Sequence, residues 1–86
     1  MPEISRFFGI LITMYFNDHA PQHFHVRYGA QKALVLIDPP ALLEGRLSPR
    51  TLGLVTEWAA LHRDELLANW HLARDQQPLN KIPPLD

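Results

Sequence analysis

The chain has 86 residues, of which 47% are hydrophobic and 20% are charged, and its formal net charge is −1. A chain of this length closes one hydrophobic core, so we expect a single domain over residues 1–86, and the composition excludes an intrinsically disordered protein. Cysteine is absent, which excludes disulfides and thiolate metal sites.

The first residues, Met1 to Arg6, lack the charged region and the long apolar run of a signal peptide. No segment is apolar over the length that a membrane span requires. We therefore expect a cytoplasmic protein that is not associated with a membrane. Because a small core leaves apolar surface exposed, we also expect a homo-oligomer or a complex with another small protein.

Residues 4–16 have the composition of β-strands. They are rich in β-branched and aromatic side chains, and Gly9 interrupts them, which predicts two strands that meet at a bend or bulge. A loop of turn-forming residues follows at 17–22. From His23 to Tyr28 polar and apolar side chains then alternate, which predicts a further strand.

A two-residue turn at Gly29–Ala30 would pair this strand with residues 31–38 in antiparallel fashion. The turn fixes four opposed pairs: Tyr28 with Gln31, Arg27 with Lys32, His25 with Leu34, and His23 with Leu36. Opposed residues share a face of the sheet, so two leucines lie beside the histidines, and we expect helices or another subunit to cover part of this face. The sequence predicts an antiparallel β-meander of about four strands over residues 3–38. Residues 41–47 are interpreted as a short connection or a further edge strand.

Residues 48–75 carry apolar side chains at helical spacing. Ser48 and Pro49 are typical of a helix start, as N-cap and first helical residue. The pattern is longer than a typical globular helix and acidic residues follow His62, so we expect two helices with a break near His62, or alternatively one bent helix. Prolines beyond residue 76 predict an extended C-terminal tail. The predicted fold class is therefore α+β, with strands first and helices after.

Three histidines, His19, His23 and His25, form the sharpest candidate for chemistry. His23 and His25 share a face of their predicted strand, and the preceding loop could fold His19 back toward them. Three neutral imidazoles with an open coordination position would suit a catalytic metal ion, and zinc is the first candidate. Asp18 is a candidate fourth ligand or a carboxylate that orients one of the imidazoles.

A second interpretation assigns the same histidines to acid–base catalysis on RNA or another phosphate ester. The phosphate would then be bound by Arg27, Lys32 and Arg6, and Arg27 joins the three histidines as a catalytic candidate. A third interpretation is structural, with the histidines bonded to the backbone of a turn. All three interpretations remain open at the level of sequence, as does the question whether the chain is an enzyme.

The run from Asn17 to Val26, NDHAPQHFHV, resembles the hallmark of a small bacterial family, domain of unknown function 4160. The chain departs from the family's pattern at Gln22, where a second proline is usual. The other matching positions are Gly9, Glu44–Gly45, Glu57–Trp58, His62, Glu65–Leu66, Trp70, Ile82 and Leu85. The resemblance implies a free-standing protein, often encoded beside a member of domain of unknown function 2442 in gene pairs that look like toxin–antitoxin modules. It supplies no established catalytic residues.

We therefore expect one component of a two-gene toxin–antitoxin-like module, directed at RNA through the histidine face, with the small protein encoded by the neighbouring gene as its partner. The alternative is a non-enzymatic binding or adaptor protein whose histidine cluster is structural or binds a metal.

Overall fold

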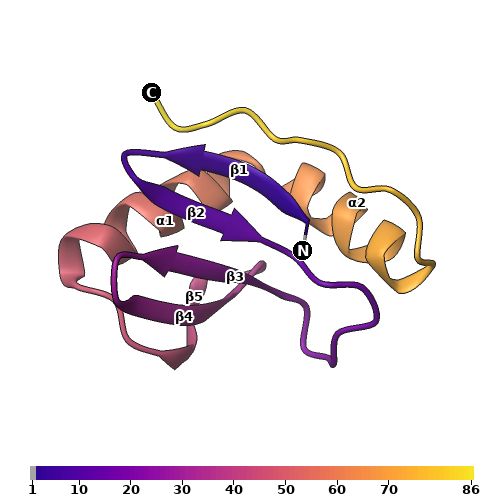
Figure 1. Ribbon diagram of the computed structural model, residues 1–86, viewed down its shortest axis with the longest axis horizontal. Helices are drawn as coiled ribbons and strands as arrows, with labels where there is room; N and C mark the ends of the chain where they lie inside the picture. The colour runs from indigo at the N-terminus through magenta and orange to yellow at the C-terminus, as the bar shows by residue number, and fades with distance from the viewer. Residues whose placement is uncertain (1) are drawn as a thin grey trace.

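The computed structural model describes residues 2–86, in which strands precede helices (Figure 1). The strands are β1 (Glu3–Phe7), β2 (Ile10–Thr13), β3 (His23–Tyr28), β4 (Gln31–Leu36) and β5 (Ala41–Gly45). Each pairs antiparallel with the next, so the sheet is a meander in the order β1-β2-β3-β4-β5. The α+β class is confirmed, with one correction: within residues 2–86 the sheet has five strands instead of about four.

The fifth strand, β5, occupies most of the segment that the sequence left as a connection or an edge strand. Its side chains are largely exposed, because β5 is an edge strand that pairs with β4 alone. A bulge between Leu34 and Val35 shifts the register of this pair. Gly45 has a φ of 89°, and a Cβ atom there would lie 2.3 Å from the carbonyl oxygen of Lys32. The close pairing of β5 with β4 therefore requires glycine at this position.

The β3–β4 hairpin has the register that the Gly29–Ala30 turn predicts, with all four opposed pairs in place. Gly29 supplies the positive φ that the turn needs, at 58°. Phe24 and Val26 point into the core, and the intervening residue His25 points to the other face.

Two helices follow the sheet, α1 (Pro49–Leu61) and α2 (Arg63–Arg74), and the predicted break at His62 is confirmed. The hydroxyl oxygen of Ser48 accepts a hydrogen bond from the Thr51 N–H at the start of α1. The helices pack against one face of the sheet, and Trp58, which is 0% exposed, anchors this packing. Neither helix in the described part of the chain is long and apolar enough to cross a membrane.

The C-terminal tail runs beside β1 as an extended chain (Figure 1), as predicted. The Ile82 N–H donates to the carbonyl oxygen of Ile4 at 2.8 Å, so the tail covers part of the outer edge of β1. The buried side chain of Asn69 holds the tail through two hydrogen bonds to the backbone of Asn80, of 2.8 and 3.0 Å. The sheet is therefore covered at its β1 edge and open at its β5 edge.

The face of the sheet that points away from the core is only partly covered. At one end of it, Trp70 of α2 lies against His23, with ring centroids 5.3 Å apart, and His23 is 4% exposed. Further along the face, Leu34 and Leu36 are partly exposed and are not among the side chains that pack in or against the core of the described chain. The expected cover of the histidine face is therefore present at His23, and cover of the leucines by another subunit stays a prediction. We call this surface the open face.

Candidate functional site

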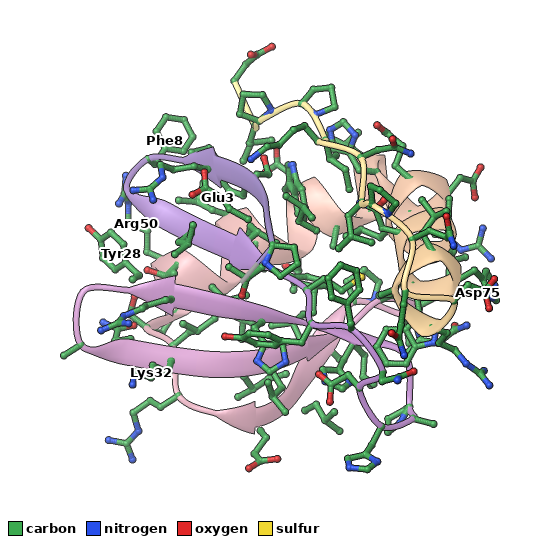
Figure 2. The ribbon with its side chains drawn as sticks, turned by 45° about the vertical axis from the view of Figure 1, so that its right-hand side comes forward. Glu3, Phe8, Tyr28, Lys32, Arg50 and Asp75 are labelled. Carbon is green, nitrogen blue, oxygen red and sulfur yellow. The ribbon has the colours of Figure 1, made fainter. Side chains whose placement is uncertain are left out.

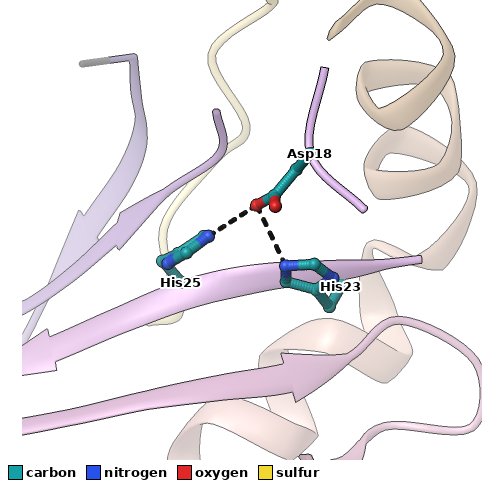
Figure 3. Close-up of side chains that lie close together, drawn as sticks. All are labelled: Asp18, His23 and His25. Atoms are coloured by element: carbon teal, nitrogen blue, oxygen red, sulfur yellow. Dashed lines mark hydrogen bonds and ion pairs between the residues drawn. The ribbon is translucent and has the colours of Figure 1, made fainter. Parts of the chain in front are cut away.

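Three predicted site residues meet at the covered end of the open face: Asp18, His23 and His25 (Figure 3). His23 and His25 come from the first half of β3, and Asp18 comes from the loop of residues 14–22. One oxygen of Asp18, Oδ2, lies 3.0 Å from Nε2 of His23 and 2.8 Å from Nε2 of His25. We call these three residues the Asp–His–His cluster.

The loop that carries Asp18 is tied to α2, because the Asn17 N–H donates to the carbonyl oxygen of Ala73 at 3.2 Å. Asn17 has a φ of 55°, a left-handed conformation that asparagine adopts more readily than most residues. This contact directs the loop back over the start of β3. Asp18 therefore reaches two histidines that follow it by five and seven positions.

Further contacts orient each member of the cluster. Nδ1 of His23 lies 2.7 Å from the carbonyl oxygen of Pro21. The other oxygen of Asp18, Oδ1, accepts a hydrogen bond from the backbone N–H of His19 at 2.9 Å. Tyr15 packs edge-on against the ring of His25, with centroids 4.3 Å apart. The orientations of all three side chains are thus fixed by their neighbours.

The pKa of the Asp18 carboxyl is lowered from its ordinary value. Partial burial is the largest single influence and acts to raise this pKa. It is outweighed by the combined effect of two hydrogen bonds, from His25 and from the His19 N–H, and of the charge interactions with both cluster histidines. Asp18 is therefore ionised near neutral pH and acts only as a hydrogen-bond acceptor.

His19 does not join the cluster, although the sequence placed it with the other two histidines. Its side chain is exposed, and it is not among the ligand atoms that converge in the described chain. The carboxylate of Asp18 lies between His23 and His25 instead, and His19 contributes only its backbone N–H. The predicted three-histidine arrangement is corrected to two histidines and one aspartate.

The open face contains a groove of about 380 Å³, and His25 stands in its wall. Leu11, Tyr15 and Leu34 supply apolar surface to this groove, while Arg27, Lys32 and Glu44 supply charge. Neither Arg27 nor Lys32 forms an ion pair within residues 2–86, although the two lie directly opposite each other. Lys32 and the acidic residue Asp75 stand at opposite ends of the molecule in Figure 2.

The third phosphate-binding candidate, Arg6, lies on the same row of the sheet. Arg6 is opposite Leu11, Leu11 is opposite Arg27, and Arg27 is opposite Lys32, so the register aligns three cations across four strands. Neighbouring strands lie about 4.8 Å apart, so the row extends over about 14 Å. Arg6 differs from the other two because it forms an exposed ion pair with Glu3, at 3.1 Å. We call Arg6, Arg27 and Lys32 the cation row.

Tyr15 and Glu44 are among the groove residues that were not predicted as site residues. Tyr15 follows Leu11 at a spacing of four residues, so continued strand alternation could have placed it on the open face. Glu44 could not be placed in this way, because it lies on β5, whose exposed residues lack a clear alternating pattern.

In a comparison with protein families, the model described as "Domain of unknown function (DUF4160)" matches residues 9–71. This range includes the Asp–His–His cluster, two members of the cation row and most of both helices. No curated protein and no solved structure matches the chain.

Proposed function

The chain belongs to the DUF4160 family, and for this member we propose the role of a cytoplasmic, RNA-directed component of a two-gene toxin–antitoxin-like module. One observation carries the proposal: the cation row crosses the open face next to an imidazole that is hydrogen-bonded to a carboxylate. The module itself is proposed from the family resemblance of the sequence.

The cation row supports a polyanionic ligand. Like charges directly opposed in a sheet repel each other. Arg27 and Lys32 are opposed in this way, form no ion pair in the described chain and are exposed, so water screens part of the repulsion and both side chains are accessible to a ligand. A phosphate between the two side chains would remove this repulsion. The apolar walls at Leu11 and Leu34 lie beside these cations and suit the faces of unstacked bases. Single-stranded RNA combines both features, phosphates and accessible bases.

His25 lies within reach of a phosphate that the cation row holds. It precedes Arg27 by two residues on β3, which corresponds to about 7 Å along the strand. Asp18 accepts a hydrogen bond from its ring at 2.8 Å and so fixes its orientation. An oriented imidazole can transfer protons near neutral pH, which makes His25 and Arg27 the catalytic candidates if the RNA is also cleaved.

A growth assay tests the module directly. The gene is expressed alone, its neighbour is expressed alone, and the two are expressed together. We expect one of the two genes to arrest growth and the pair to restore it, and we expect Arg27→Ala to abolish the contribution of this chain while His71→Ala, which changes an exposed histidine of α2, does not. Normal growth under all three conditions would contradict the proposal.

The module also requires a protein partner, and the free edge of β5 is our candidate for its docking site. Leu42 and Leu43 on this edge are 40% and 39% exposed, and an unpaired edge strand can accept another strand. Light scattering of this chain with the neighbouring gene's product should give a complex whose mass is the sum of the two. If this chain associates with itself in the absence of that product, the β5 edge would serve a homo-oligomer instead. If both samples contain only monomers, docking at the β5 edge is excluded.

A second candidate function is a non-enzymatic adaptor in which the Asp–His–His cluster is structural. The burial of His23 against Trp70 favours it, because a packed ring stabilises the fold whatever its chemistry. If the chain is an adaptor, alanine substitutions in the Asp–His–His cluster should lower the melting temperature of the protein, while its RNA binding is unchanged or absent.

A further inference from the structure

We propose that the Asp–His–His cluster binds a divalent transition-metal ion, with zinc as the first candidate. Three potential ligand atoms, Oδ2 of Asp18 and Nε2 of both histidines, lie within 4.8 Å of one another. The single oxygen atom faces both nitrogens (Figure 3), at 3.0 and 2.8 Å. The space among these atoms is where a shared cation would be held.

The hydrogen bonds of His23 indicate that a positive charge belongs in this space. Nδ1 of His23 faces the carbonyl oxygen of Pro21 at 2.7 Å, and that oxygen can only accept, so Nδ1 carries a hydrogen. A neutral imidazole has one N–H, which leaves a lone pair on Nε2. This lone pair points at the carboxylate oxygen of Asp18, 3.0 Å away. Two lone pairs at this distance repel each other unless a proton or a metal ion lies between them.

The neighbours of the cluster favour the metal ion over the proton. Metal-binding histidines typically donate their second ring N–H to a carbonyl or carboxylate, as His23 does to Pro21. Ligating carboxylates are likewise hydrogen-bonded, as Asp18 is to the His19 N–H through the oxygen that does not face the histidines.

The donor set identifies the class of metal. Two imidazoles and one carboxylate suit zinc and neighbouring first-row ions better than magnesium or calcium, which prefer oxygen ligands throughout. Tetrahedral zinc, with bonds of about 2.1 Å, places neighbouring ligand atoms about 3.4 Å apart. The observed separations of 3.0 and 2.8 Å therefore need to widen by about 0.4 and 0.6 Å. The side chains of His25 and Asp18 are 27% and 21% exposed, so a fourth position is accessible from solvent.

Zinc would occupy Nε2 of His25, so the acid–base role proposed for His25 applies to the metal-free chain. The inference does not depend on the RNA proposal, because zinc binding is measured without RNA. Full-length protein, stripped with a chelator and then dialysed, is titrated with zinc chloride in a calorimeter, and its melting curve is recorded with and without the metal. We expect one zinc ion per chain and a higher melting temperature. His25→Ala and Asp18→Asn should each weaken binding by more than about 100-fold, the upper end of the loss caused by removing a residue that merely supports a ligand.

Two histidine variants are the matched controls. His19→Ala changes a residue of the same loop and His71→Ala changes a residue of α2, and both side chains are exposed and outside the cluster. Both variants should bind zinc as the unmodified chain does. The proposal is overturned if the unmodified chain shows neither binding heat nor a zinc-dependent melting shift, or if zinc binding survives both His25→Ala and Asp18→Asn.

Nitrogen NMR of the histidine rings provides a second readout that does not require any variant to fold. With zinc, His23 should carry its single hydrogen on Nδ1, and the Nε2 resonance should shift toward the metal-bound range. A ring of His23 that keeps hydrogens on both nitrogens in the presence of excess zinc would show an imidazolium–carboxylate pair instead of a metal site. That result would also overturn the proposal.

Discussion

If RNA binds to the cation row as proposed, its affinity should depend on the salt concentration in a way that can be calculated. Each phosphate neutralised on a single strand contributes a slope of about −0.7 to a plot of log K against log salt concentration. Arg27 and Lys32 lack ion-pair partners in the described chain, so they should engage two phosphates and give a slope of about −1.4. Affinity should then fall about sevenfold when the salt concentration rises from about 50 to 200 mM. Arg6 should contribute less, because its ion pair with Glu3 must first be broken.

Arg27→Ala tests this calculation. One lost phosphate contact should halve the slope to about −0.7, so that the same rise in salt weakens binding only about threefold. The assay is fluorescence anisotropy with a labelled single-stranded RNA of roughly ten nucleotides, a length within the usual site size of small binding domains. Arg74→Ala removes an equal charge from the end of α2 and is the control. A slope that responds equally to both variants would mean that net charge, and not the open face, governs binding.

Three further predictions concern the scaffold that holds the site. Asn69→Ala removes both hydrogen bonds to the backbone of Asn80 and should cost about 2 to 4 kcal/mol in urea unfolding, whereas Asn80→Ala, which keeps that backbone, should be nearly neutral. Gly45→Ala places a Cβ against the Lys32 carbonyl and should destabilise the fold by more than about 1 kcal/mol, while Gly53→Ala, with open space in α1, should stabilise it by about 0.5 to 1 kcal/mol. Because the pKa of Asp18 is lowered in the folded chain, its contribution to stability is complete above the unfolded pKa of about 3.9 and is lost as the pH falls through the lower folded value. The difference in unfolding free energy between the unmodified chain and Asp18→Asn should therefore shrink as the pH falls below about 3.9, and a difference that grows below that pH would contradict this sign.

The fold was accessible from the sequence where local rules determine it. A two-residue turn at Gly29 fixes which residues oppose one another, so the β3–β4 register followed from counting. Ser48 and Pro49 mark the start of α1, where a helix leaves backbone N–H groups without partners. The side chain of Ser48 accepts a hydrogen bond from one of these groups, and Pro49 has no N–H to leave unpaired. Trp58 and Trp70 fall within the apolar helical pattern of residues 48–75, and both are buried.

The remaining features depend on contacts between segments that are distant in the chain. The hold of Asn69 on the tail joins residues 11 positions apart, and no pattern in either segment reveals it. The position of Asp18 depends on the hydrogen bond between its loop and the carbonyl oxygen of Ala73. Ala73 lies in the last turn of α2, far from the strands in sequence. The sequence therefore identified Asp18, His23 and His25 as candidates, but it also included His19, whose side chain is exposed and lies outside the cluster. It also left β5 ambiguous, because an edge strand can be exposed on both faces.

One measurement addresses most directly the central claim that the open face is the functional surface. Uniformly ¹⁵N-labelled protein is titrated with the single-stranded RNA described above, and the amide chemical shifts are followed residue by residue. We predict that the largest shifts fall on the open-face groove and the cation row, at Leu11, His25, Arg27, Lys32 and Leu34, with little change at the exposed residues of α1 and α2. Shifts concentrated on the helices, with β3 and β4 unaffected at saturating RNA, would contradict the assignment of the open face.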